Sequence, residues 1–284
     1  MFKFYCNTRL FFLAIFFSLI VFSKIVYSNP KDFCLISMPK CGTHLGTKLL
    51  EMLTERKKMP SSVLNNHLNT LSDQQFALII QNYNNQQAFI YGHTNPNAFG
   101  PFFLRYAYSQ PGKIIFCSIR DLRDMLISFI FHKEKNIKDE LGGEATFDQM
   151  LTQVLNPTQS FCGKLIQEEA QFCLQFFQLP NVCTLPFEEL VGPKGGGNKK
   201  NQRQLIMKVA RKLNLFLPQD ELDYICNHLF GNDKKDEEAN ALPRAGTFRS
   251  GQIGSWKKYF KSEHHKLFRE YWGSYQVAFG YTLE

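Results

Sequence analysis

Short apolar segments alternate with amphipathic helical patterns from Lys31 onward, and this alternation limits the possible folds more than any other feature of the sequence. The apolar runs with the length of buried strands are Asp32–Ser37, Ala88–Tyr91, Lys113–Ser118 and Val182–Leu185. Apolar residues at helical spacing predict helices at Thr43–Glu55, Asp73–Tyr83, Leu122–His132, Phe147–Leu155, Gly163–Phe177, Gln202–Leu213, Gln219–Leu229 and Glu263–Phe279. Such alternation indicates a parallel sheet covered by helices on both faces, so we predict a single α/β domain over residues 31–284.

The composition supports a folded domain with a mildly basic surface. Hydrophobic residues make up 44% of the 284 residues and charged residues 20%, which permits a sizeable core and excludes global disorder. The formal charge is +8; residues 29–284 hold 30 basic and 25 acidic residues, which leaves +5. This excess suits an anionic small ligand or an acidic acceptor, although an ordinary solvated surface would also account for it.

The N-terminal 28 residues have the pattern of a targeting segment. Lys3 and Arg9 precede the apolar run Leu10–Phe22, which is short for a membrane span and typical of a signal-peptide core. We predict that residues 1–28 are a signal peptide or, alternatively, an uncleaved signal anchor that touches the membrane. Either assignment places the protein in the secretory pathway, exported or membrane-anchored.

The cysteines do not form a disulfide framework or a metal-binding pattern. Eight are present, seven remain without Cys6, and no two have the CxxC spacing. We expect at most one disulfide, among Cys162, Cys173, Cys183 and Cys226, and no metal site.

The segment Met38–His44 lies between the first predicted strand and its helix. A turn with Gly42 at the helix start directs backbone N–H groups toward an anion, and Lys40 adds a mobile positive charge. The Walker spacing GxxxxGK[ST] is absent, because Gly42 and Gly46 stand at the wrong distance. Taken alone, this segment could equally be an ordinary strand-to-helix turn.

Two further segments carry groups suited to a phosphate. Arg120 and Ser128 follow the third predicted strand, and an arginine fork with a hydroxyl can hold a phosphate monoester. Arg123 and Asp124, in the same segment, are interpreted as surface or helix-end ion pairs. In the segment Phe248–Lys257, Arg249 adds charge and Gly251 lets the backbone approach the phosphate, with Ser250 between them.

In this order, the three segments resemble the motifs PKSGTTW, RDPxDVxxSxxxH and RKGxxGxWK of sulfotransferases that use 3′-phosphoadenosine-5′-phosphosulfate (PAPS). His132 falls on the closing position of the second motif. The chain departs from the motifs at Cys41 for Ser, His44 for Thr, Leu45 for Trp, Leu122 for Pro and Ser250 for a basic residue.

The resemblance implies a P-loop-NTPase-like sulfotransferase fold and a nucleotide-binding transferase. The enzyme would move a sulfuryl group from PAPS to an acceptor hydroxyl or amine without a metal. By analogy with the family, the 5′-phosphosulfate would be bound by Lys40, Cys41, Gly42, Thr43 and His44. The 3′-phosphate would be held by Arg120, Ser128, Arg249, Ser250 and Gly251.

The predicted catalytic pair is His93, as base, and Lys40, which would neutralise the leaving oxygen. His93 closes the strand AFIYGH, and the resemblance supports it, because many family members carry a base histidine at the end of the corresponding strand. Imidazole, with a pKa of about 6.5, can accept a proton at neutral pH. Glu188 or Glu189 is the rival base, beside Phe187 where the family often has Tyr.

Two other functions stay open at this point. One is a P-loop-type nucleotide kinase or NTPase, and the other is an exported non-catalytic binding protein that keeps the fold. The acceptor could be a carbohydrate, a lipid, a peptide or a small molecule; no nucleic-acid partner is expected.

Overall fold

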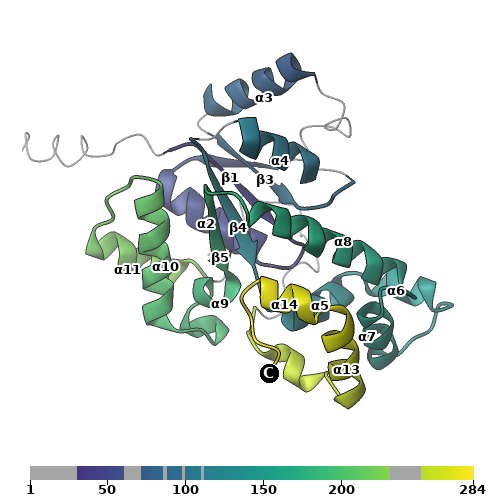
Figure 1. The fold of residues 1–284 in the computed structure, drawn as a ribbon. Helices are drawn as coiled ribbons and strands as arrows, with labels where there is room; N and C mark the ends of the chain where they lie inside the picture. Colours follow the sequence, from purple (N-terminus) through teal and green to yellow (C-terminus); the bar gives the residue numbers. More distant parts are fainter. Residues whose placement is uncertain (1–30, 61–71, 86–87, 98–99, 110–111, 231–250) are drawn as a thin grey trace, which may run out of the picture.

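The computed structural model describes residues 31–60, 72–85, 88–97, 100–109, 112–230 and 251–284 (Figure 1). The segment 1–28 and the residues Arg249 and Ser250 lie outside these ranges, so what the sequence predicts for them remains a prediction. Among the helices of the described part, none is both long enough and apolar enough to cross a bilayer.

A five-stranded parallel sheet forms the centre of the described structure. Its strands are β1 (Phe33–Ser37), β2 (Lys57–Pro60), β3 (Ala88–His93), β4 (Ile114–Ile119) and β5 (Val182–Pro186). They lie in the order β2-β3-β1-β4-β5, and every neighbouring pair is parallel. The predicted α/β fold with a central parallel sheet is confirmed.

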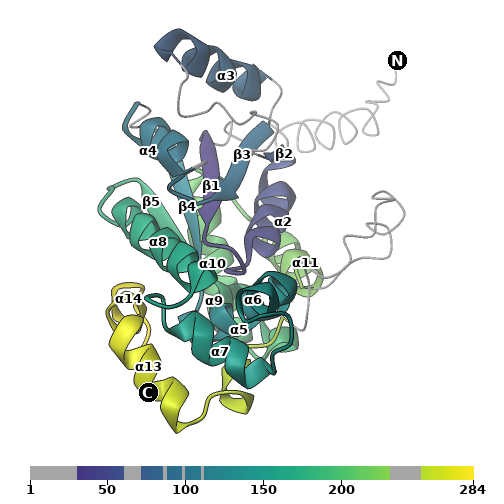
Figure 2. The ribbon, with the colours of Figure 1, turned by 90° about the vertical axis from the view of Figure 1, so that its right-hand side faces the viewer.

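Helices cover both faces of the sheet (Figure 1). One face packs on α2 (Thr43–Thr54), α10 (Lys199–Lys212) and α11 (Gln219–His228). The core on the other face is shared by residues of α4 (Gly100–Ser109), α5 (Leu122–His132), α7 (Phe147–Leu155), α8 (Phe161–Phe176) and α13 (Ser262–Tyr271). Figure 2 shows α8 running along the sheet, with α7 and α13 beyond its end. The remaining elements are α3 (Asp73–Asn85), α6 (Glu134–Glu140), α9 (Phe187–Leu190), α14 (Gly273–Ala278) and the 3₁₀ turns Pro193–Gly195 and Ser255–Lys258.

The two helical layers explain why the central strands are buried at every position and apolar at all positions but one in each. All five residues of β1 and all six of β4 are buried. Side chains alternate between the faces, so that Cys34 and Ile36 face the α4–α8 side while Phe33 and Leu35 face α2 and α10. A strand buried on both faces reads as a continuous hydrophobic run rather than as an alternation.

The predicted helix Glu263–Phe279 is wrong as a single element. The chain forms α13 and α14 instead, and the break falls at Trp272, whose backbone φ of −120° leaves the helical region. Trp272 is fully buried, and its indole N–H donates to the carbonyl of Leu155 at 3.0 Å. Anchoring this large side chain under α7 therefore redirects the chain.

All seven cysteines of the described residues are free thiols. Two of them, Cys117 on β4 and Cys173 on α8, place their Sγ atoms 3.6 Å apart in the core. These thiols contribute to the packing between the sheet and α8.

Candidate active site at the carboxyl edge of the sheet

The segments singled out in the sequence meet where the central strands end. Ser37, the last residue of β1, is in register with His93 on β3 and with Ser118 on β4. Strands β2 and β3 lie on one side of β1, and β4 and β5 lie on its other side, so the strand order reverses at β1. A parallel sheet binds its ligands outside the carboxyl ends of its strands at such a reversal of strand order.

The loop after β1 has a backbone that directs a helix N-terminus at this edge. Lys40 (φ 65°) and Gly42 (φ 94°) both adopt left-handed conformations, and Gly42 is the N-cap of α2 without a side chain to cap it. The first N–H groups of a helix have no acceptor within the helix, so they form an anion-binding end. A Cβ atom on Gly42 would lie 2.8 Å from Cδ2 of Phe187, so this close approach also requires glycine.

Cys41 and Thr43, in the same loop, turn their side chains inward. Cys41 is 1% exposed, and its N–H donates to the carbonyl of Met38 at 3.3 Å. Burial raises the pKa of the Cys41 thiol well above its ordinary value, which leaves it unreactive. The hydroxyl of Thr43 lies 2.5 Å from that of Ser37. Of the two side chains, only that of Thr43 keeps a polar group at the strand end.

Arg120 connects the three motif segments. Its guanidinium donates to the carbonyls of Lys40 (3.4 Å) and Gln252 (2.9 Å) and lies 4.1 Å above the ring of Phe187. Arg120 is 5% exposed, and its Nε has no hydrogen-bond partner among the described residues. A buried donor without an acceptor is costly, and an anionic ligand would satisfy it.

Two other predicted phosphate ligands fall within the described residues. Ser128 is buried on α5, about two helical turns beyond Arg120. Gly251 opens the third segment with a φ of 60°. Such a backbone fits the predicted close approach to a phosphate.

Asp124 is not the surface residue that the sequence suggested. It is 1% exposed, and its carboxylate accepts bonds from the N–H of Gly254 (2.6 Å), the hydroxyl of Ser255 (2.8 Å) and the N–H of Trp256 (2.9 Å). These bonds fix the third segment against α5. The surface interpretation is wrong because these contacts join residues that are 130 or more positions apart, and a local sequence pattern does not reveal such contacts.

Arg123 forms the predicted helix-end pair, but it too is buried. Its guanidinium binds both oxygens of Asp121, the N-cap of α5, at 3.0 and 2.6 Å. It also donates to the carbonyls of Thr282 and Glu284 and lies 4.1 Å above the ring of Trp256. The chain end therefore packs against the start of α5.

His93 lies beside the loop after β1, because it ends β3 and β3 is the neighbour of β1 in the sheet. Its Nδ1 is 3.4 Å from both the hydroxyl and the carbonyl oxygen of Ser37, and part of its ring is open to solvent. Desolvation by the surrounding protein lowers the pKa of His93. The positive charges of His44, Lys40 and His132 lower it further, against the opposing effect of the bond to Ser37.

Glu188, a rival base, is occupied by structural contacts. Its carboxylate accepts the N–H of Asp121 at 3.0 Å and the hydroxyl of Tyr281 at 2.5 Å. Burial raises the pKa of Glu188, while these two bonds lower it. Glu188 thus joins the start of α5 to the C-terminal segment, which favours His93 as the base.

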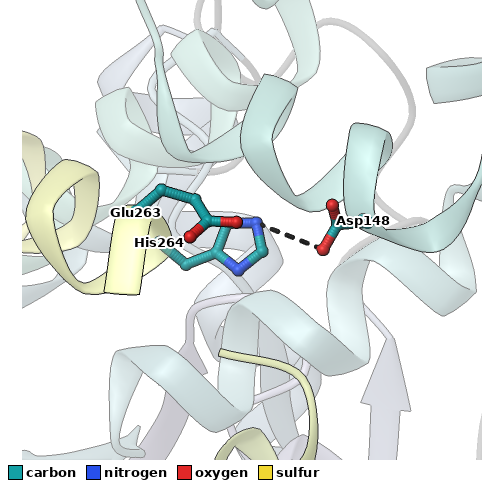
Figure 3. A group of neighbouring side chains, drawn as sticks. All are labelled: Asp148, Glu263 and His264. Carbon is teal, nitrogen blue, oxygen red and sulfur yellow. Dashed lines mark ion pairs between the residues drawn. The ribbon is translucent and has the colours of Figure 1, made fainter. Parts of the chain in front are cut away.

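A separate cluster of possible metal ligands lies between α7 and α13 (Figure 3). It consists of Asp148, Glu263 and His264. The ammonium of Lys261 already binds Asp148 at 2.6 Å. Nδ1 of His264 accepts the N–H of Lys261 at 3.1 Å, while Nε2 is 3.1 Å from the hydroxyl of Thr152. These contacts cap the start of α13, so we assign them to the helix end and not to a metal site.

Sequence reasoning missed Ser37. Its hydroxyl touches both Thr43 and His93, yet in the sequence it only closes an apolar run. A small polar residue at the carboxyl end of a buried strand is the signal that could have found it, because that position faces the ligand edge of a parallel sheet.

A parallel sheet whose central strand leads through a glycine turn into a helix N-terminus is the architecture of P-loop-like α/β proteins. Comparison with known families narrows this class, because the model of the sulfotransferase domain matches residues 30–277. The chain therefore belongs to the sulfotransferase family.

A solved structure agrees with the fold. The crystal structure of the mouse sulfotransferase SULT7A1 complexed with PAP matches with a TM-score of 0.58 and 18% sequence identity. The match covers 87% of this chain and 86% of the mouse chain. A search of curated proteins gave no match.

Proposed function

We propose that this enzyme transfers a sulfuryl group from PAPS to an acceptor hydroxyl or amine, with His93 as base. The observation that carries the proposal is Arg120, a buried guanidinium that joins all three motif segments and keeps one N–H without an acceptor. The mouse sulfotransferase is complexed with PAP, which supports an adenosine bisphosphate as a ligand of this chain.

The residues at the carboxyl edge fit the two charged ends of PAPS. The N-terminus of α2, Lys40 and the Thr43 hydroxyl would hold the 5′-phosphosulfate, with Cys41 and His44 shaping the same turn. The 3′-phosphate would be held by Arg120, Ser128 and Gly251, together with Arg249 and Ser250. When bound, PAPS supplies a sulfuryl group joined to a phosphate oxygen, which is a good leaving group.

The protein's part in the reaction is to bind, to orient and to move one proton. His93, neutral at pH 7 because its pKa is lowered, accepts the proton of the acceptor hydroxyl or amine. Lys40 places a positive charge where negative charge develops on the leaving oxygen. Group transfers of this kind depend mainly on positioning and charge neutralisation, and Lys40 with Arg120 supplies the cationic charge.

Calorimetric titration with 3′,5′-adenosine bisphosphate (PAP) tests the donor site, with ATP as the control ligand. We expect micromolar binding of PAP, little matched by ATP. Arg120→Ala should weaken it about 10- to 100-fold, because a charge-assisted hydrogen bond contributes roughly 1.5–3 kcal/mol. Arg211→Ala, which changes an exposed arginine on α10, should leave affinity unchanged. A preference for Mg-ATP would contradict the proposal and favour a kinase.

Transfer of radiolabelled sulfate from PAPS to a panel of carbohydrates, lipids, peptides and phenols would then identify the acceptor. Turnover with any compound of the panel, together with its loss in His93→Gln, would support the proposal that the protein is an enzyme with His93 as base. Tight PAP binding without turnover on every member would favour the non-catalytic alternative.

We also propose that residues 1–28 send the chain into the secretory pathway. The support is the basic start and the thirteen-residue apolar run Leu10–Phe22. Fusing residues 1–28 to a reporter and testing its protection from added protease in a microsomal translocation assay would decide this. A reporter that stays outside the microsomes would overturn the proposal.

A further inference from the structure

One buried serine contacts both the proposed base and the anion-binding turn. Ser37, the last residue of β1, is fully buried, and its hydroxyl lies 2.5 Å from that of Thr43 and 3.4 Å from Nδ1 of His93. Thr43 belongs to the anion-binding turn, and His93 is the proposed base. The Ser37 hydroxyl is therefore the middle member of a chain that runs from the base to the anion site.

The backbone fixes this arrangement. Ser37 and His93 are register partners on adjacent parallel strands, and the carbonyl of Ser37 accepts the N–H of Thr94 at 3.0 Å. The same carbonyl is 3.4 Å from Nδ1 of His93. The turn between β1 and α2 then returns Thr43 to the strand end. Because sheet and helix hold both partners, Ser37 meets them without a flexible segment in between.

A hydroxyl donates one hydrogen, so such a chain has only two directions. In the first, His93 Nδ1–H donates to Ser37, Ser37 donates to Thr43, and the hydrogen of Thr43 points at the anion. In the second, Thr43 donates to Ser37 and Ser37 donates to an unprotonated Nδ1. The first direction leaves Nε2 of His93 with a lone pair, and the second places the proton on Nε2.

We propose that Ser37 is a positioning residue that couples donor binding to the base form of His93. The inference rests on the proposed function. An anion at the α2 N-terminus attracts the Thr43 hydrogen, which selects the first direction and protonates Nδ1 of His93. Nε2 then becomes the atom that accepts the acceptor's proton. The partner of the second ring nitrogen commonly fixes which nitrogen of a histidine reacts.

The charged groups around His93 act with this chain. Lys40 acts on it from the β1–α2 turn, His44 from the first turn of α2, and His132 from the end of α5. All three disfavour a second proton on the ring. They do not distinguish Nδ1 from Nε2, whereas Ser37 does, because it contacts Nδ1 alone.

The test is a long-range ¹H–¹⁵N correlation spectrum of the full-length protein, which distinguishes the two neutral tautomers of His93, recorded before and after PAP is added. In the wild type, PAP should increase the Nδ1–H form. Ser37→Ala should abolish this response and lower kcat about 10- to 100-fold with a much smaller change in acceptor KM, in keeping with the weight of proton transfer in catalysis. Ser37→Thr, which keeps the hydroxyl, should restore both.

Ser118→Ala is the matched control. Ser118 pairs with Ser37 in register on the neighbouring strand, is equally buried, and its hydroxyl has no partner among the described residues. In Ser118→Ala, PAP should increase the Nδ1–H form of His93 as it does in the wild type. If Ser37→Ala fails to fold, Thr43→Val removes the hydroxyl at the other end of the chain of hydrogen bonds. Because Thr43 also belongs to the anion-binding turn, PAP is added to this variant at a concentration that saturates it, and the tautomer of His93 should then stay unchanged.

Failure of this inference is distinct from failure of the proposed function. A wild type that does not bind PAP contradicts the function itself. A wild type that binds PAP and turns over, while Ser37→Ala or Thr43→Val keeps the tautomer response shown by Ser118→Ala, contradicts the coupling role of Ser37.

Discussion

Arg120 and Asp124 show how single side chains assemble the site from distant segments. Arg120 reaches the carbonyl of Gln252, and Asp124, one helical turn further on, binds the backbone of Gly254 and Trp256. The two residues lie 4.0 Å apart at their charged ends. The cation and the carboxylate therefore hold the third segment between them, and the cation keeps one donor for a ligand.

The lowered pKa of His93 predicts how activity depends on pH. The ring must be neutral to act as a base, so acid inactivates it. Because desolvation and then neighbouring positive charges lower its pKa, half of the maximal kcat/KM should be reached below about pH 6.5, the ordinary value for histidine. His93→Gln should lose about 100-fold or more in kcat/KM at neutral pH. His228→Gln, on α11, should keep the wild-type profile. A midpoint above pH 6.5 would argue against His93 as the base.

Glu169 on α8 predicts a pH-dependent stability. It is 8% exposed, its Oε2 has no partner among the described residues, and burial raises its pKa to about 7, against the weaker effect of Lys133. Between about pH 4.5 and 7 the folded chain keeps a proton that the unfolded chain has lost. Stability therefore falls as the pH rises through this window.

Glu169→Gln removes that titration. In urea unfolding, the variant should be more stable than the wild type at pH 8, by up to about 3 kcal/mol, and should gain little at pH 4.5. An equal gain at both pH values would show that packing, rather than ionisation, accounts for the difference in stability between Glu169→Gln and the wild type.

At the level of helices and strands, the turn from β1 into α2 is the most constrained piece of the site. Gly42→Ala would combine a left-handed backbone (φ 94°) with a Cβ 2.8 Å from Phe187. Gly142→Ala is the matched control, since its φ is 90° but nothing lies within 4 Å of its Cβ. Both should lose about 1 kcal/mol to backbone strain. Only Gly42→Ala should also lose PAP affinity, because Phe187 or the turn has to move. Equal PAP binding by both variants would contradict this role of the turn.

The elements that the sequence predicted well are those with a strong local pattern. Helices α5 and α7 match the predicted bounds, and the four apolar strands shift by at most two residues at either end. Strand β2, KKMP, was missed because a short, lysine-rich edge strand carries no apolar run. Helix α4 was missed because Gly100-Pro101 reads as a loop, although proline is well tolerated in a first helical turn.

The site could be located from the sequence but not assembled from it. Lys40, His93 and Arg120 each stand at or after the end of a predicted strand, and parallel strands bring their carboxyl ends to one edge, so the sequence places the three residues at that edge. The bonds of Arg120 to Gln252 and of Asp124 to Trp256 depend on how the third segment crosses the edge. No local pattern encodes that crossing, because it is set by packing between segments far apart in the chain.

The last residues of the chain pack beside the carboxyl edge of the sheet. Tyr281 donates to Glu188 at 2.5 Å, and Arg123 donates to the carbonyls of Thr282 and Glu284 at 3.3 and 3.0 Å. Glu188 also binds the start of α5 through the N–H of Asp121. The C-terminal segment thus links α5 to α9. These contacts stabilise the start of α5, next to Arg120.

Deleting residues 281–284 should therefore destabilise the protein and weaken PAP binding together. Arg123 and Glu188 would each lose buried hydrogen-bond partners. The loss of a hydrogen bond to a charged group costs about 1.5–3 kcal/mol, so the two losses together cost about 3–6 kcal/mol. For a domain of this size, such a loss should lower Tm by about 10 °C. Thr282→Ala is the control, because the backbone carbonyl at this position, not the exposed side chain, accepts the bond from Arg123. An unchanged Tm after the deletion would mean that the segment packs on the edge without supporting it, and the PAP affinity of the deletion variant should then equal that of Thr282→Ala.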